Sequence, residues 1–482
     1  MIKVVKSKMN FVELCLIISP FLDLLTSIGI NEFNSNATIG MLIRTIIIAV
    51  LLLYFIKNNL KKKKEIIIYF TILFSFFCMH IINSYFSKEI FSLFFEVKNF
   101  IKIFYFPVSF VLLISYLENR KMEKKYIFYC GIIYILFLFF PYILGISYDT
   151  YSNGKKGSIG LFYSPNEIGA ILGILIPFVL MYIYKFKNIK KHIIIHFICI
   201  FSMMSIGTKV PFLAIVVFAI MYMLVLIIRR KIDREKFEKK YFIQVLATLV
   251  ISLILMVTIS PLGQNMRWQL EWFDKHYKED VKNNTDEQNN VKPDKGEDNT
   301  QNDVLNVDED NISNEAPNVN EDNISDSLIS NDKKTINSKF DKIMNLLFSS
   351  RNIYVKKYMK NWNNSTLNNK LLGFGYSKSN VLEQNIVEID YFDVFYNYGV
   401  LGFIIYFVPL LLLIIRFGSY IIHNFIEFIN NDDMCTYFMS ICLSFVIALF
   451  AGHLFITPAP SFILAIIIST LYIDIKVHMN KI

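Results

Sequence analysis

The sequence predicts an all-α polytopic membrane protein of about 12 transmembrane helices, with one large extracytoplasmic loop between helices 9 and 10. Of the 482 residues, 54% are hydrophobic and only 18% are charged, which is too apolar for the surface of a soluble globular domain. The apolar residues fall in blocks of roughly 20, the length that spans a hydrocarbon core of about 30 Å. Lysine and arginine gather in alternate gaps between these blocks, the pattern that cytoplasmic loops show.

Nine apolar blocks precede a long polar segment and three follow it. The predicted spans are 10–30, 38–56, 66–86, 102–118, 126–147, 162–186, 192–207, 210–228, 241–262, 396–416, 435–454 and 457–474. We therefore divide the chain into residues 1–262 with helices 1–9, residues 263–395 as the loop, and residues 396–482 with helices 10–12.

Basic residues occupy the N-terminus, the second, fourth, sixth and eighth gaps and the C-terminus, and the tenth gap, near Arg416, is the one weak case. The clearest case is the eighth gap, with seven basic residues from Arg229 to Lys240. Because cytoplasmic loops carry the excess of lysine and arginine, both termini are predicted to be cytoplasmic and the long loop to lie outside. The expected location is the cytoplasmic (plasma) membrane, and the first block is long enough to remain as a span rather than be cleaved as a signal peptide.

The long loop has two parts of different character. Sixteen acidic residues and three lysines lie between Glu279 and Asp332, and residues 279–333 contain too few apolar side chains to offset the entropy of ordering, so this insertion is predicted to be disordered. The run Asp308-Glu309-Asp310 inside it is read either as a solvated acidic tract or as a metal-binding acid pair.

Residues 335–395 are predicted to be ordered. Apolar side chains recur at helical spacing beside lysines, which indicates an amphipathic helix on the membrane surface, broken near Ser349 and Ser350. A glycine turn, Gly373-Phe374-Gly375, follows. Two tryptophans at the start of the loop, Trp268 and Trp272, fit an interfacial aromatic belt.

Charged residues inside spans are costly and mark functional or paired groups. Asp23, Arg44 and His80 are each predicted to lie roughly 10 Å below the outer surface, from a rise of 1.5 Å per residue. Two readings of Arg44 stay open. It forms a structural ion pair with Asp23, or it lies beneath an anionic site on the outer face.

Two further cations fall on the predicted outer side. Lys209 follows Gly207-Thr208 in a tight turn, where it either snorkels to the interface or binds phosphate. Arg351 lies in the amphipathic part of the loop, where it is either an ordinary exposed side chain or a bidentate ligand of phosphate, because guanidinium keeps its charge and its planar fork fits phosphate oxygens.

Acidic residues cluster immediately before span ten. Asp390, Asp393 and Asn397 share a helical face at i, i+3 and i+7, and Glu388 precedes them. Carboxylates where bilayer meets water are expected to have raised pKa values and to serve as general bases, and simple interfacial polarity is the alternative. Gly399 and Gly402 then permit close helix packing.

Four motifs in the same order resemble the O-antigen ligase and polymerase superfamily, whose members handle polyprenyl-pyrophosphate-linked glycans outside the cytoplasmic membrane. The resemblance covers roughly residues 155–405. The stretch from Ser164 through Pro165, Asn166 and Glu167 to Ala170 looks like an N-P-N segment that opens a span, and Ser205 to Lys209 looks like a T-x-S-R turn with lysine in place of arginine. Arg351, Trp362 and Gly373 to Gly375 look like an R…W…G-x-G run, and Glu388 to Gly402 looks like an H-N…G-x-x-G segment.

The last motif departs from the family pattern, because Glu388 stands where ligases have histidine and none of the seven histidines falls in 335–395. The E-x-D version looks more like polymerases of Gram-positive surface polysaccharides. The resemblance therefore implies a metal-independent glycosyltransferase that joins polyprenyl-pyrophosphate-linked repeat units into a surface polysaccharide such as a capsule. Its implied partners are the lipid-linked substrate, the bilayer and other envelope polysaccharide assembly proteins, without nucleic acid.

The roles that follow are predictions from this resemblance and from the charges. Arg351 and Lys209, with Arg44 deeper in the membrane, are expected to bind the pyrophosphate, and Arg351, Glu388 and Asp390 to be catalytic. Asn166, Gly373, Gly375, Gly399 and Gly402 are expected to shape the site. A diphosphate leaving group is already activated, so no metal, nucleotide or other cofactor is expected, and the sequence contains no P-loop or H-E-x-x-H motif.

Two other functions stay open. One is transfer of the glycan to a wall component or a protein, as a ligase does. The other is a flippase for lipid-linked oligosaccharides, which twelve spans with both termini inside would suit. Transporters of this size often have two similar halves, whereas the loop here divides nine spans from three, and this asymmetry favours the enzyme.

Overall fold

The computed structural model describes residues 9–33, 39–118, 120, 122–151, 155–232, 238–268, 351–377 and 387–479. Within these ranges the chain is almost entirely helical, and the only β-type pairing is a bridge between Asp149 and Ser158. The predicted all-α polytopic membrane fold is confirmed. The acidic insertion 279–333, the beginning of the predicted amphipathic segment and Trp272 lie outside the described residues.

The first half of the bundle begins with α1 and ends with α10. Its helices are α1 (Phe11–Phe33), α2 (Ile39–Asn59), α3 (Lys64–Ser87), α4 (Leu93–Ile103), α5 (Tyr105–Leu117), α6 (Lys125–Leu144), α7 (Pro165–Tyr184), α8 (Ile189–Ser205), α9 (Lys209–Ile232) and α10 (Lys239–Thr258). The remaining helices are α14 (Arg351–Asn363), α15 (Leu367–Leu372), α16 (Asp390–His423), α17 (Phe425–Asn430), α18 (Asp432–Phe450) and α19 (Pro458–Met479).

Ten of these helices are long and apolar enough to cross a membrane, and the bent pair α4 and α5 brings the number to 11. The two helices of this pair meet at 48° around Phe104. The sequence predicted about 12 spans, and the difference is α8. It lies where a span was expected but has 17 residues, which places it at the lower limit of about 17 residues for a transmembrane helix.

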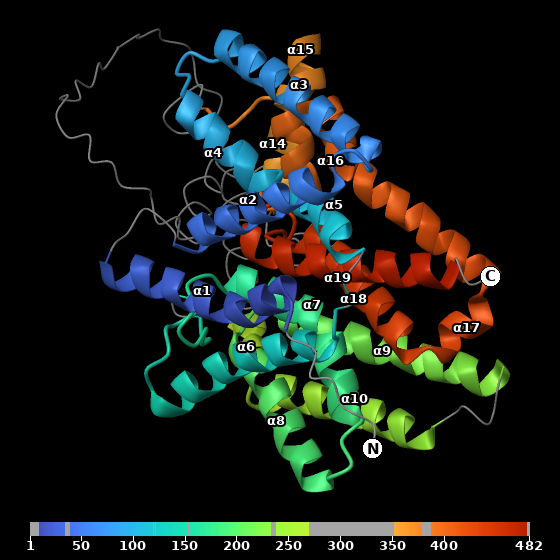
Figure 1. The fold of residues 1–482 in the computed structure, drawn as a ribbon. Coiled ribbons are helices and arrows are strands. Elements are labelled where there is room, and N and C mark those ends of the chain that lie inside the picture. The colour runs from blue at the N-terminus through green and yellow to red at the C-terminus, as the bar shows by residue number, and fades with distance from the viewer. Residues whose placement is uncertain are drawn as a thin grey trace, which may run out of the picture.

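The helix α7 lies at the centre of the bundle. In its apolar span 89% of the residues are buried, whereas the corresponding share is only 17% in α10 and 22% in α3. In Figure 1, α3 and α16 lie at one edge of the bundle and α8 and α10 at the other, with α7, α18 and α19 between them. Small residues allow the central helices to approach closely: a Cβ added at Gly173 of α7 would lie 2.4 Å from Ile447 of α18. Such contacts replace the hydrophobic effect as the source of helix association in lipid.

The helix α14 has one buried and one exposed face. It buries Tyr358 and Trp362 and exposes lysines such as Lys360. Its apolar face packs in a small hydrophobic cluster with Val387, Ile389 and Tyr396, so this face is covered by the start of α16. The aromatic cluster fixes Arg351, the first residue of α14, relative to the acidic residues around the start of α16.

A second contact holds α15 against α16. The helix α16 bends at Gly399, whose φ of 66° and ψ of −173° are not helical, and α15 ends at Gly373 with φ of 85°. A Cβ on Gly373 would lie 2.2 Å from the carbonyl oxygen of Asn397, and one on Gly399 would lie 2.5 Å from the nitrogen of Gly373. Both glycines are therefore required by a backbone crossing as well as by their positive φ.

We predict that Gly373→Ala destabilises the protein, because the added methyl group meets backbone atoms and the φ value is strained for alanine, at a cost of about 1–3 kcal/mol. The matched control is Gly418→Ala in α16, where an added Cβ meets nothing within 4 Å, and we expect it to be neutral or to stabilise by about 0.5–1 kcal/mol. Thermal unfolding of the detergent-solubilised variants measures both. Equal midpoints for the two variants would show that the crossing is not needed.

Candidate active site

Arg351 and Glu388 form an ion pair between the start of α14 and the residues before α16. The Nη2 atom of Arg351 lies 2.6 Å from Oε2 of Glu388, and the two side chains are 11% and 29% exposed. Nη1 of Arg351 also donates to the carbonyl oxygen of Phe450, at the end of α18, over 3.4 Å. The structure thus brings together the cation and the carboxylate that the sequence singled out for catalysis, although 36 residues separate them.

Lys209 lies on the same side of the bundle and interacts electrostatically with Arg351 and with Lys155. It is the first residue of α9 and follows the tight turn at Gly207, whose φ is 78°. The amide Nδ2 of Asn265 donates to the carbonyl oxygens of Gly207 over 3.2 Å and of Lys156 over 2.7 Å. Asn265 therefore holds together the two segments that carry Lys209 and Lys155.

Asp390 and Asp393 are fully buried and each binds backbone N–H groups of a neighbouring loop. Oδ2 of Asp390 accepts from the nitrogens of Leu454, over 2.8 Å, and Phe455, over 2.6 Å. Oδ1 of Asp393 accepts from the nitrogen of Val387 over 2.7 Å. A carboxylate that accepts backbone N–H groups orders the donating loop, so Asp390 fastens the α18–α19 loop to the start of α16 and Asp393 fastens the segment that carries Glu388.

His453 is a site residue that sequence reasoning missed. It lies in the α18–α19 loop, and its Nε2 is 3.7 Å from Oε2 of Glu388. The only signal in the sequence was its position beside Gly452, at the end of a predicted span on the same side as the long loop. The resemblance directed attention to residues 335–395, where no histidine occurs, whereas the structure supplies a histidine from 65 residues further along the chain.

The pKa of Glu388 is shifted in the direction opposite to the predicted rise. Burial raises it, but the charges of His453 and Arg351 outweigh burial and hold the pKa well below its usual range. For His453 the effects have opposite signs. Burial lowers its pKa, and the facing carboxylate of Glu388, with a smaller contribution from Glu167, outweighs burial and raises the pKa to about 9. Two cations facing one carboxylate explain why the expectation for Glu388 was wrong.

Glu167 and Lys102 flank this group, from the first turn of α7 and the last turn of α4. Glu167 interacts electrostatically with His453, and Lys102 with Glu167, Asp390 and Asp393. The helix α7 begins at Pro165, with Ser164 as its N-cap, so the motif predicted to open a span does so. Asn166 lies in the same first turn, at the end of α7 that is nearest to Glu167 and His453. Its side chain is partly exposed.

Arg44 lies deeper and is already paired. Its Nη2 is 2.6 Å from Oδ1 of Asp23, with side-chain exposures of 4% and 12%, and the hydroxyl of Tyr134 donates to the other oxygen of Asp23. Of the two readings left open by the sequence, these contacts favour the structural ion pair.

Glu96 and His80 hold the turn that contains Gly375. Oε1 of Glu96 accepts from the nitrogens of Tyr376, over 2.9 Å, and Ser377, over 2.6 Å. A Cβ on Gly375 would lie 2.7 Å from that oxygen. His80 donates from Nδ1 to the carbonyl oxygen of Leu372 over 2.8 Å, and its Nε2 is 3.6 Å from Glu96. Gly402, further along α16, packs against Phe76 of α3, so it allows a close approach of these two helices.

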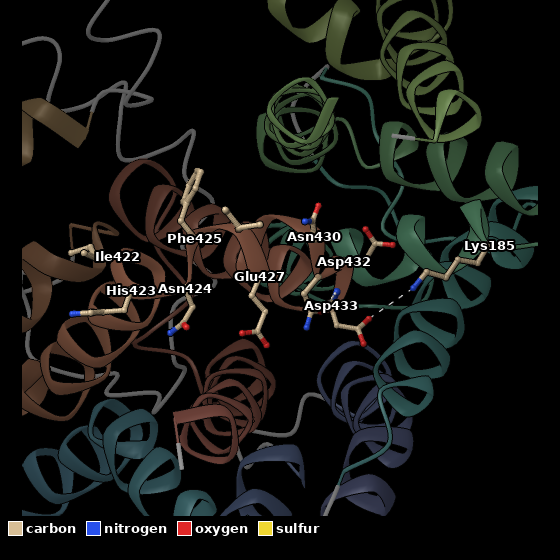
Figure 2. A pocket seen from close by; sticks show the side chains of 11 residues that line it. Lys185, Ile422, His423, Asn424, Phe425, Glu427, Asn430, Asp432 and Asp433 are labelled. Carbon is tan, nitrogen blue, oxygen red and sulfur yellow. Dashed lines mark hydrogen bonds and ion pairs between the residues drawn. The ribbon is translucent and has the colours of Figure 1, made fainter. Parts of the chain in front are cut away.

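All these groups lie at one end of the bundle, where α7, α9, α16 and α19 begin and α18 ends. A hollow of about 960 Å³ lies at the opposite end, lined by Lys185 and by residues between 422 and 433. Figure 2 shows that acidic side chains line it, and Asp433 faces Lys185 at 3.9 Å. Asp432 is paired with Arg229 and Asp433 also with Lys124. The hollow is therefore separate from the group around Arg351.

Among the described residues, no cluster of three or more His, Cys, Asp and Glu side chains is arranged to hold a metal ion.

We predict that Arg44→Leu destabilises the protein by about 3–5 kcal/mol, because it leaves the buried Asp23 without its counter-ion. The double variant Asp23→Leu/Arg44→Leu should recover most of this loss, since removing both charges of a buried pair is often neutral. Thermal unfolding in detergent measures both variants. If the double variant folds well but binds lipid pyrophosphate much more weakly than the wild type, Arg44 is a substrate ligand rather than a structural ion.

Comparison with known proteins identifies the family of the chain. No curated protein and no solved structure matches the chain. A family model described as "O-antigen ligase like membrane protein" matches residues 6–478. The match includes the whole group around Arg351 and both halves of the bundle, and it supports a membrane-bound activity of glycan polymerase or ligase type with a lipid-linked glycan as substrate. The chain therefore belongs to the family of O-antigen ligase-like membrane proteins.

Proposed function

We propose that the protein polymerises polyprenyl-pyrophosphate-linked oligosaccharide repeat units into a surface polysaccharide at the outer face of the cytoplasmic membrane. The observation that carries the proposal is the Arg351–Glu388 ion pair, with Lys209 nearby. A phosphate-binding guanidinium, a carboxylate and a second cation meet at the end of a membrane helix bundle, where a lipid-linked anion presents its head group.

The distribution of charge supports the outer location. The basic residues of the even-numbered gaps, such as Lys185 and Arg229, lie at the opposite end of the bundle from Arg351. Loops rich in lysine and arginine remain in the cytoplasm. On this basis both termini are cytoplasmic, and the group around Arg351 faces the outside.

In the proposed reaction a growing glycan on polyprenyl pyrophosphate is the donor, and a sugar hydroxyl of a second lipid-linked unit is the acceptor. The hydroxyl oxygen forms a bond to the anomeric carbon of the donor while the bond from that carbon to the pyrophosphate oxygen breaks. The electron pair of the broken bond leaves with the pyrophosphate, and the hydroxyl proton passes to Glu388 and from there to solvent. No oxidant, metal or nucleotide is consumed.

The charges around Glu388 fit these roles. Arg351 and Lys209 stabilise the negative charge that develops on the leaving pyrophosphate. Glu388 is held ionised by its neighbours, so it orients the acceptor hydroxyl as a hydrogen-bond acceptor, and it becomes a stronger base for the hydroxyl proton when Arg351 turns to the pyrophosphate. Asp390 is occupied by backbone N–H groups and supports the site by positioning the α18–α19 loop.

The direct test uses purified protein and lipid-linked repeat units in the presence of a chelator. We expect the wild type to give a ladder of longer glycans and Arg351→Ala to reduce the rate by about 10²–10³-fold, the loss that removal of one transition-state donor gives. Lys360→Ala is the matched control, because Lys360 is an exposed cation on the same helix, and we expect it to retain wild-type activity.

Three outcomes would contradict the proposal. A fully active Arg351→Ala variant would remove the assigned role of the guanidinium. Transfer of the glycan only to a wall component or protein would identify a ligase. Single units that accumulate on the inner leaflet of a deletion strain would identify a flippase, whereas accumulation on the outer leaflet is expected for a polymerase.

A further inference from the structure

His453 and Glu388 share an unusual backbone geometry. Among the described residues, these two are the non-glycine residues with positive φ, at 58° and 63°. Side chains with a Cβ rarely adopt this region, and such conformations persist where the surrounding structure imposes them. The side chains of the two residues approach to 3.7 Å, so both unusual backbone positions lie at the same contact.

Several contacts impose the geometry on the His453 loop. A Cβ on Gly452 would lie 2.2 Å from the carbonyl oxygen of Glu388, so the two backbones touch directly before the histidine. Asp390 binds the nitrogens of Leu454 and Phe455 immediately after it. The hydroxyl of Tyr406 donates to the carbonyl oxygen of Phe455 over 3.0 Å. His453 is thus held on both sides by groups of α16 and of the segment before it.

The imidazole is held but has an unused hydrogen-bonding atom. Its Nε2 is buried and makes no hydrogen bond with any described residue, because 3.7 Å to Oε2 of Glu388 is within ion-pair distance but beyond hydrogen-bond distance. A small movement of the Glu388 carboxylate closes that gap. In the present arrangement, the same Oε2 atom is engaged by Arg351 at 2.6 Å.

We propose that His453 is a positioning residue for the transfer reaction: its imidazolium keeps Glu388 ionised and directed at the acceptor hydroxyl when Arg351 leaves that carboxylate for the donor pyrophosphate. This inference rests on the proposed function. The proposed function gives Arg351 two partners, because it pairs with Glu388 in this structure and binds the pyrophosphate of the substrate in the reaction. A second cation beside Glu388 allows both, because the buried carboxylate is then never left without a counter-ion.

The protonation of His453 sets a pH range for this role. The charged groups that face it are Glu388 and Arg351, Glu167 from α7, and Asp390 and Asp393 from α16. Glu388 raises the pKa of His453 from 6.5 to about 9. A contact with a raised pKa contributes its full stability below the ordinary value and loses it as the pH rises through the folded value. The Glu388–His453 contact is therefore present at neutral pH and is lost above about pH 9.

The test compares the pH profiles of wild type, His453→Gln, His453→Lys and the control His423→Gln. His423 is exposed at the opposite end of the bundle. For the wild type we expect kcat/KM to fall above about pH 9. We expect His453→Gln to lower kcat by about 10- to 100-fold, as loss of an orienting partner does, with little change in KM, and to lack that fall. His453→Lys should restore part of kcat and move that fall to higher pH, and His423→Gln should match the wild type.

Unchanged kcat and an unchanged pH profile in His453→Gln, with wild-type polymerisation, would overturn the inference and leave the proposed function standing. If the wild type makes no polymer from any lipid-linked substrate, the proposed function fails, and thermal unfolding then tests the Glu388–His453 contact on which the inference depends. The unfolding midpoint of the wild type should then approach that of His453→Gln as the pH rises through about 9. A difference between the two that does not vary with pH would overturn the inference. His453→Lys keeps the cation and serves if the glutamine variant does not fold.

Discussion

The ion pair between Arg351 and Glu388 is the contact on which the arrangement of this site depends. It joins the start of α14 to the residues before α16, and through Phe450 it also reaches the end of α18. Both charges are largely withdrawn from water. If Glu388 were removed, Arg351 would be a partly buried charge without its carboxylate partner, which is destabilising. The pair therefore fixes the loop on the helix bundle and concentrates charge at the place proposed for chemistry.

The other acidic residues of the site serve a different purpose. Glu96, Asp390 and Asp393 each accept hydrogen bonds from backbone N–H groups, and in this way they fasten residues 376–377, 454–455 and 387. Glu388 alone among these four is paired with an arginine, although Glu96 has His80 at 3.6 Å. This division explains how one carboxylate remains available to a substrate in a region where buried acids are common, because the remaining three are used to order the loops around it.

The sequence predicted most of the bundle because its signal is strong. Blocks of apolar residues located most of the helices, and α8, at 17 residues, is short for a span. The charges of the site were also recognisable one by one, since Arg351, Lys209 and Glu388 are expensive or unusual where they occur. Local patterns do not reveal which of them meet. The pairing of Arg44 with Asp23 and the arrival of His453 beside Glu388 depend on contacts between helices distant in sequence, and the pKa of Glu388 was misjudged because its two cations were not known.

The most direct test of the central claim is a double-mutant cycle on Arg351 and Glu388, with kcat/KM for polymerisation measured in Arg351→Ala, Glu388→Ala and the double variant. Residues that act as a unit are strongly non-additive. The account predicts that the double variant is about as impaired as the worse of the two single variants. A double variant whose loss equals the product of the two single losses would show that Arg351 and Glu388 act independently, and it would contradict the account.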